Sequence, residues 1–179
     1  MNSGRQPRAA RDSRLSEVQA AGDSECRRNG TRLQRLPARA ITTRGLGGGD
    51  WSPKDLIGHL ESWEQHALDA LEAWARGDLA PSDVALRSAG LNALNRAEVE
   101  RKSRRSAAKS LEEATDTHRR IVAAIRSLPE ERWLAPATRR ARRPLGRSIG
   151  GILGGPTGPF RHDAAHHPDL REFVAVHAR

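Results

Sequence analysis

The sequence predicts an all-α fold. Apolar residues recur at three- and four-residue steps in several segments, no segment alternates steadily between apolar and polar residues, and β-branched residues are sparse. The 179 residues are close to the size of one ordinary domain, and 36% of them are hydrophobic, which suffices for one core of modest size. We therefore expect one helical domain over residues 45–179, preceded by a basic N-terminal segment over residues 1–44 in which large aliphatic residues are few.

The most clearly marked helix follows Ser52. This serine can cap the free backbone amides of the first turn, Pro53 is tolerated at the first helical position, and Asp55 can close a capping box. Apolar residues then recur with helical spacing, and Gly77 is a natural stop. These signals predict a helix over residues 53–76.

Two more helices are expected downstream. A second pattern runs over residues 91–128, and its polar part over residues 101–106 is expected to project beyond the core or to fray. Its apolar stripe comprises Ala107, Leu111, Ala114, His118, Ile121, Ile125 and Leu128. After Trp133, glycines and prolines predict an irregular stretch. The last helix should begin at residue 159 or 160 and run toward His177, with a break at Pro168, because proline removes a backbone hydrogen bond and clashes with the preceding turn.

The formal net charge of +9 is unevenly distributed. Residues 1–50 and residues 136–179 each carry +5, whereas the helically patterned middle carries −1. Charge runs outside patterned segments are usually solvated, and a chain with four Trp, two Phe and no Tyr offers little for base stacking. A nucleic-acid-associated protein that uses the arginines between residues 139 and 147 is therefore a less favoured function class.

The single cysteine, Cys26, limits both redox chemistry and metal binding. One cysteine cannot form an intrachain disulfide or a cysteine-based zinc cage, so any metal must rely on histidines and carboxylates. The arginine-rich N-terminus lacks the apolar run of a secretory signal, and no stretch is apolar and long enough to span a bilayer. We expect a cytoplasmic protein with no membrane partner.

Three of the seven histidines are candidate ligands of one divalent metal ion. His162 and His166 are four residues apart on a predicted helix, which places both imidazoles on one face. His59 lies beside the apolar stripe of the first marked helix and should point into the bundle. Three protein ligands with a vacant position are typical of a catalytic site that activates water or a thiolate. A pair at this spacing also arises by chance among seven histidines, so the spacing alone is a weak signal.

The other candidate side chains have weaker signals. His66 is too far along the helix from His59 to share its ion, and His118 is expected to be a hydrogen-bonded core residue or to orient a ligand. We expect Trp63 to form a wall of the pocket. Glu64 and His66 lie near the site in sequence, but no pattern assigns either of them as the general base, and the catalytic residues stay unknown.

The motifs resemble a known superfamily. The stretch GGGDWSPKDLIGHLESWEQHAL resembles the signature of the DinB-like four-helix bundles, also described with the YfiT-like metal-dependent hydrolases, and HDAAHHPDL resembles their HxxxHxxDL segment. LNALNRAEVE and GGPTGPF are similar to the ClbS/DfsB family within it. The resemblance covers residues 45–175 and carries a metal triad onto His59, His162 and His166, the three residues that the spacing had selected.

The resemblance also implies an architecture and a set of partners. It implies an up-down-down-up bundle, commonly homodimeric, that binds a divalent ion such as zinc or nickel. It places a first helix over residues 10–38, where this chain lacks the apolar stripe, so we expect either a degenerate first helix or the product of a reading-frame or start-site error upstream.

These expectations combine into one leading function and its rivals. We expect a metal-dependent hydrolase or thiol-dependent transferase that acts on a small electrophilic substrate, with a low-molecular-weight thiol as a partner and a role in detoxification or self-resistance. The first rival is a bundle of the same fold that sequesters a small molecule without turnover. The second is the nucleic-acid-associated protein, and the third is an inactive bundle that folds poorly.

Overall fold

The computed structural model describes residues 33, 35–156 and 158–178, and within these ranges the regular structure is helical. The helices are α3 (Ala38–Ile41), α4 (Pro53–Arg76), α5 (Pro81–Ala89), α6 (Leu91–Lys102), α7 (Ala107–Ser127), α8 (Glu130–Leu134), α9 (Leu145–Ile152), α10 (His162–Ala165) and α11 (His167–His177). The described ranges contain isolated β-bridges but no strand, which confirms the all-α prediction for this part of the chain. The prediction of a degenerate first helix falls almost wholly on residues 1–32 and 34, which lie outside the described residues.

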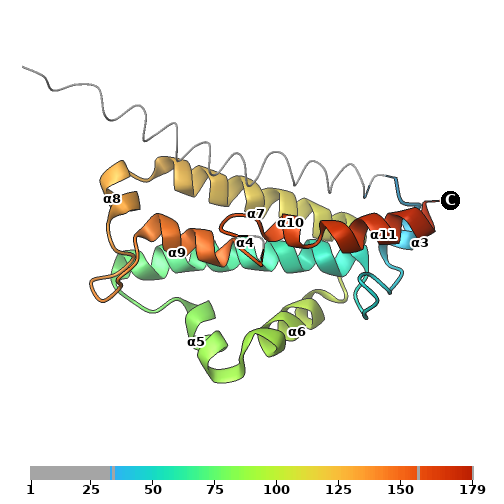
Figure 1. Cartoon of the computed structure of the whole chain (residues 1–179), viewed down its shortest axis with the longest axis horizontal. Coiled ribbons are helices and arrows are strands. Elements are labelled where there is room, and N and C mark those ends of the chain that lie inside the picture. Colours follow the sequence, from blue (N-terminus) through green and yellow to red (C-terminus); the bar gives the residue numbers. More distant parts are fainter. Residues whose placement is uncertain (1–32, 34, 157, 179) are drawn as a thin grey trace, which may run out of the picture.

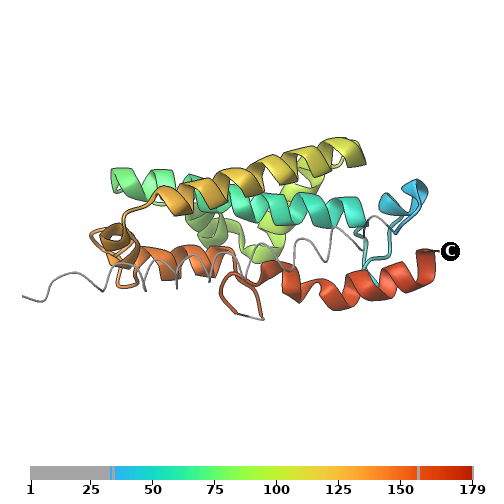
Figure 2. The same ribbon diagram turned by 90° about the horizontal axis from the view of Figure 1, so that it is seen from above.

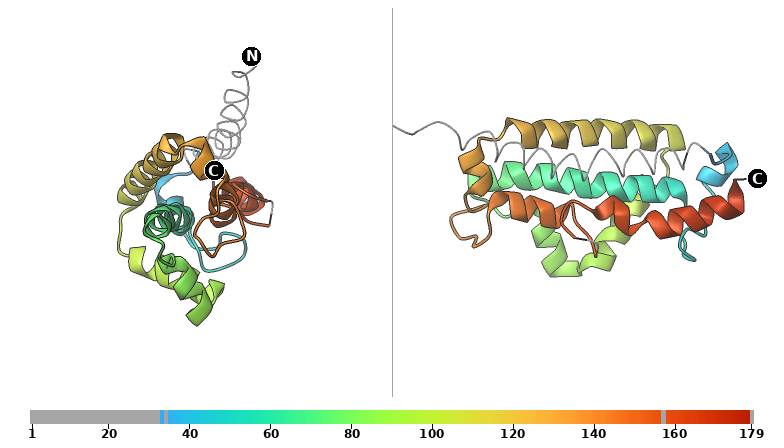
Figure 3. Two further views of the ribbon diagram at one scale, coloured as in Figure 1. Left: turned by 90° about the vertical axis from the view of Figure 1, so that its left-hand side faces the viewer. Right: turned by 45° about the horizontal axis from the view of Figure 1, so that its top comes forward.

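Helix α4 is the centre of the arrangement (Figure 1). It contacts α7 along much of its length, and it also contacts α5, α6 and α9. The end-on view in Figure 3 shows α7, the α5–α6 pair and the α9–α11 segment around three sides of α4. Figure 2 shows the α9–α11 segment running beside α4, while α7 crosses α4 in this view. A side chain on α4 can therefore meet residues from either flank.

The ends of α4 agree with the prediction from sequence. The Ser52 hydroxyl accepts a hydrogen bond from the Asp55 amide at 3.3 Å, and the Ser52 amide donates to the Asp55 carboxylate at 3.0 Å, which completes the capping box. Gly77 ends the helix with φ 85°, a left-handed conformation that glycine adopts without a Cβ penalty.

The predicted helix over residues 91–128 is wrong as one element. It is divided into α6 and α7, because the Ser106 hydroxyl accepts a hydrogen bond from the Lys109 amide at 3.1 Å and starts a new helix there. Helix α5 also forms between the two predicted helices, with Pro81 in its first turn. Within the stretch expected to project or fray, Lys102 is buried.

The predicted apolar stripe of α7 is correct only in its C-terminal half. Ile121 and Ile125 are buried, whereas Leu111 is 54% exposed. In the N-terminal half the buried positions are Ser110 and Thr117, which belong to a neighbouring face of the helix. This half of α7 packs against polar groups rather than against an apolar surface, as the Thr117 hydroxyl shows by donating to Glu61 at 3.4 Å.

The stretch after Trp133 is more regular than expected. Helix α9 forms within it and buries Leu145 and Ile149. Gly146 permits its close approach to α8, because a Cβ at this position would overlap the ring of Trp133. The final helix is broken at His166 into α10 and α11, as Pro168 predicted, and α11 buries Leu170 and Phe173.

Two apolar clusters lie along α4. The cluster at its C-terminal half comprises Ala67, Leu68, Ala70, Trp74, Ala80, Ile121, Ile125, Trp133, Ala137, Leu145 and Ile149. The cluster at its N-terminal half comprises Leu36, Ala40, Leu46, Leu56, Leu170 and Phe173. Between them along α4 lies the turn that carries His59. No helix in the described ranges combines the length and the apolar character needed to span a membrane.

Candidate metal centre

Three histidines converge from segments far apart in the sequence. One ring nitrogen from each of His59, His162 and His166 lies within 4.8 Å of the others. Nε2 of His59 is 3.1 Å from Nε2 of His162, and the His59 ring centroid is 5.3 Å from that of His166. The structure thus brings together the three candidate ligands selected from sequence.

The capped helix α4 places His59 in the interior. His59 is 3% exposed, because it lies on the face of α4 that also buries Leu56. Two indole rings flank it, with the centroid of Trp51 at 4.8 Å and that of Trp63 at 6.5 Å. This apolar setting keeps the imidazole away from water.

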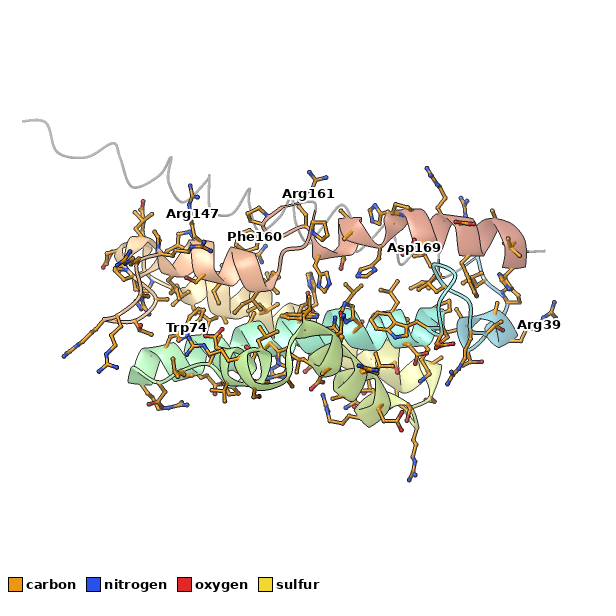
Figure 4. All side chains as sticks on the ribbon, turned by 60° about the horizontal axis from the view of Figure 1, so that its bottom comes forward. Arg39, Trp74, Arg147, Phe160, Arg161 and Asp169 are labelled. Carbon is orange, nitrogen blue, oxygen red and sulfur yellow. The ribbon has the colours of Figure 1, made fainter. Side chains whose placement is uncertain are left out.

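A glycine-rich turn places His162 opposite His59. The Phe160 amide donates to the Gly150 carbonyl at 3.1 Å, and the His162 amide donates to the Leu153 carbonyl at 3.2 Å. Phe160 has φ 57°, a left-handed conformation that is uncommon for a bulky residue, and its ring stacks on Trp133 with centroids 6.3 Å apart. Figure 4 shows Phe160 at this turn between α9 and α10. The turn folds back on α9 and so directs α10 toward α4.

Burial controls the protonation of the three imidazoles. Burial, reinforced by the neighbouring histidines, lowers the pKa of His59 to about 2. Burial and the proximity of His166 lower the pKa of His162 to about 4. The pKa of His166 is also lowered by burial, although Asp169 acts in the opposite direction. All three rings are therefore neutral at pH 7 and can offer a nitrogen lone pair.

The donor set fits a divalent ion such as zinc. Two nitrogens bound to one tetrahedral zinc at about 2.0–2.1 Å each would lie about 3.4 Å apart, close to the 3.1 Å between Nε2 of His59 and Nε2 of His162. The 4.8 Å span of the group means that one imidazole must move closer to complete such a site. Nδ1 of His59 is buried and has no hydrogen-bond partner among the described residues, so this part of the chain does not supply the outer partner that commonly orients a metal-bound histidine.

A cleft opens beside His162. The empty space in it, including the part open to solvent, is about 520 Å³. Its lining residues are Leu60, Trp63, Glu64, His118, Ile121, Val122, Ile125, Leu153, Phe160, His162 and Asp163. Most of this lining is apolar, and Trp63 forms part of the wall as expected from sequence. His66 is not among the lining residues, so of the two candidates considered for a general base only Glu64 reaches the cleft.

The sequence did not predict one polar pair in the cleft, His118 and Glu64. Nδ1 of His118 is 2.6 Å from the Oε1 carboxylate oxygen of Glu64, and both side chains are partly exposed. The two residues lie on α7 and α4, 54 positions apart, so no local spacing relates them. His118 is therefore hydrogen-bonded as expected, but it is 28% exposed and lines the cleft instead of belonging to the core.

A buried ion pair lies behind the turn of α4 that carries His59. The Lys102 ammonium, which is 3% exposed, donates to the Glu61 carboxylate and to the Gly58 carbonyl, the latter at 2.6 Å. Burial lowers the pKa of Lys102, and the hydrogen bond to Glu61 opposes that effect. The pair joins the end of α6 to the turn of α4 that presents His59.

The family assignment agrees with this architecture. A sequence model described as the DinB superfamily matches residues 12–154. The chain belongs to the DinB superfamily. No curated protein and no solved structure matches it. The match includes His59 but ends before His162, so the convergence of the three histidines in this DinB-superfamily protein is seen in its structure.

Proposed function

We propose that this DinB-superfamily protein is a divalent-metal-dependent enzyme whose ion is held by His59, His162 and His166. The observation that carries the proposal is the convergence of three neutral imidazoles, one of which, His162, also lines an apolar cleft. The superfamily is associated with metal, which supports the same conclusion. Three protein ligands leave a position of the ion for water or substrate.

The cleft suits a small electrophilic substrate. Its aliphatic and aromatic walls would bind the apolar part of such a molecule and exclude bulk water from the reacting centre. The ion, when bound, supplies Lewis acidity and lowers the pKa of a nucleophile. We propose a hydrolase or a thiol-dependent transferase, in which the nucleophile is water or a low-molecular-weight thiol and the reaction serves detoxification or self-resistance.

Finer features belong to the same proposal. We propose zinc or nickel as the ion, the ClbS/DfsB family as the subgroup, an up-down-down-up order of four main helices and a homodimer. The similarity of LNALNRAEVE and GGPTGPF to that family supports the subgroup. We also propose a cytoplasmic location, which the single cysteine favours.

The metal content of the purified chain tests the proposal. After supplementation with zinc or nickel and removal of free ion, the wild type should retain one ion per chain, and His162→Ala should retain almost none. His177→Ala is the matched control, because His177 stacks on Phe173 away from the triad and should keep its ion. A wild-type protein that retains no ion would refute the proposal.

Sequestration without turnover is the second candidate, favoured by the apolar lining of the cleft. If the protein is an enzyme, its metal-loaded form should hydrolyse many equivalents of an activated ester or should couple many equivalents of a thiol to an electrophilic aromatic compound. A single stoichiometric equivalent, bound and never released as product, would favour sequestration.

The exposed arginines between residues 139 and 147 are the basis of a third candidate, nucleic-acid binding. Arg147 and Arg161 point away from α4 (Figure 4). This candidate requires binding that weakens steeply with salt and survives replacement of all three candidate metal ligands by alanine.

A further inference from the structure

We propose that His118 is the general base of the cleft and that Glu64 is the residue that positions it. This inference rests on the proposed function, because it assigns the proton transfer of that same site. The pair is distinct from the three candidate metal ligands, and both of its members line the cleft together with His162.

The hydrogen bond to Glu64 determines which ring nitrogen of His118 can act as the base. The Glu64 carboxylate is an acceptor when ionised, so the hydrogen bond of 2.6 Å places the proton of a neutral His118 on Nδ1. The lone pair then lies on Nε2, the nitrogen that would take a proton from a nucleophile. The negative charge of Glu64 stabilises the imidazolium that forms. A carboxylate that holds a histidine base in this way is a recurrent arrangement in hydrolases.

Glu64 and His118 are held in place by the packing of α4 and α7. Glu64 follows Trp63 on α4, and Trp63 also faces His162, with ring centroids 6.0 Å apart. His118 lies on α7 beside Thr117 and one turn before Ile121, both of which are buried. The strongly packed contact between α4 and α7 therefore sets the distance between the carboxylate and the imidazole.

The proton transfer balances for both nucleophiles. Water or a thiol would lose its proton to Nε2 of His118, and the electron pair released from the O–H or S–H bond would form the new bond to the electrophilic carbon. The bond from that carbon to the leaving group would then break, and Nε2 would return the proton to the leaving atom. No oxidant or reductant is needed, and His118 ends in its starting state.

Hydrolysis of 4-nitrophenyl acetate by the full zinc-loaded chain tests the role of His118. We expect His118→Asn to lower turnover by about 100-fold or more, since general base catalysis contributes about 10²–10⁴, while the zinc content stays at one ion per chain. His177→Asn is the control and should keep wild-type turnover. Zinc-loaded wild type that turns over the ester no faster than His118→Asn would overturn the proposal. Loss of zinc from the wild type would instead refute the proposed function.

Nitrogen-15 spectra of the histidine rings test the role of Glu64 independently of activity. In the wild type the neutral His118 ring should carry its proton on Nδ1, and Glu64→Ala should remove this preference and lower turnover. Glu72→Ala, an exposed position on the same helix, should change neither. A His118 ring whose proton position is the same in the wild type and in Glu64→Ala would overturn the positioning role.

Discussion

Among single residues, the three converging imidazoles have the largest electrostatic consequence. Each has a pKa below the ordinary value of 6.5, with burial as the leading cause. Burial of a neutral ring costs little, whereas its protonation inside the bundle would place a positive charge beside two other histidines without an acidic partner in the triad. The three rings are therefore neutral at pH 7 and could serve as ligands of a metal ion.

The metal-free protein should lose stability as the pH falls below 6.5. The pKa values of His59 and His162 are about 2 and about 4 in the folded chain and 6.5 in the reference state, so in this window the unfolded chain binds more protons. The free energy of unfolding should be flat from pH 8 to pH 7 with respect to these groups and should decrease from pH 6.5 to pH 5. Urea titrations across this range measure it, and a constant value between pH 7 and pH 5 would contradict the account.

Gly150 provides a second prediction for a single residue. A Cβ there would lie 2.7 Å from Cε2 of Phe160, whose ring is already held against Trp133. Gly150→Ala should destabilise the fold by about 1–3 kcal/mol, as overpacking does, and should weaken zinc binding by displacing the turn before His162.

Gly151 is the matched control in the same helix, since a Cβ there meets no atom within 4 Å. Gly151→Ala should be neutral or stabilising by up to about 1 kcal/mol. Thermal unfolding and zinc titration compare the two variants, and equal effects of the two substitutions would contradict the role assigned to Phe160.

At the scale of elements, a buried ion pair holds three helices together. Lys102 at the end of α6 contacts Glu61 on α4, and Glu61 accepts a further hydrogen bond from Thr117 on α7. Loss of Lys102 would leave the buried Glu61 carboxylate with only the more distant and partly exposed Arg105, at 3.6 Å, as a cationic partner. The contact also adjoins Gly58, the residue before His59, so it supports the turn that presents the first candidate ligand.

Removal of the buried ammonium should therefore destabilise the protein. We expect Lys102→Met to lower the free energy of unfolding by about 3–5 kcal/mol, the usual effect of breaking a buried pair. Lys109→Met is the control, because the side chain of Lys109 is 51% exposed and its ion pairs lie on the surface. The control should change stability by less than about 0.5 kcal/mol. Denaturant titrations of both variants measure the free energy of unfolding. A Lys102→Met protein as stable as the Lys109→Met control would contradict the role of the ion pair.

The elements also show what the sequence could predict. Helix α4 was predictable to the residue because its capping box and terminal glycine are local signals. The break between α6 and α7 was not, because a polar stretch has the same pattern whether it frays or surrounds a buried lysine. The histidine spacing indicated His162 and His166, whereas the pairing of Glu64 with His118 depends on the packing of α4 against α7 and has no local signature.

Across the whole molecule, the histidine group lies between the two apolar clusters. His59 lies on α4 between Leu56 of one cluster and Ala67 of the other, and His162 and His166 precede Leu170 in the chain. An ion bound to all three histidines would connect α4 to the α10–α11 segment at the point where the apolar contact is interrupted. Metal binding should therefore stabilise the fold as well as supply chemistry.

Zinc should accordingly raise the unfolding temperature of the full chain. A ligand that binds only the folded state adds about 2.7 kcal/mol at a free concentration of 100 times its Kd, and the gain should vanish in the His162→Ala variant. When zinc is added, backbone amides in both apolar clusters along α4 should exchange their hydrogens more slowly. Protection confined to one cluster would contradict the proposed connection between them.

The central claim is that one ion is held by three histidines from α4 and the α10–α11 segment. Calorimetric titration of the metal-free chain with zinc tests it most directly, with His59→Ala, His162→Ala, His166→Ala and the control His177→Ala alongside the wild type. We expect one ion per chain for the wild type and the control. In each of the three ligand variants we expect a loss of affinity beyond the roughly 10–100-fold that removal of an outer partner costs. Wild-type binding that survives in His59→Ala, or no binding at all, would contradict the central claim.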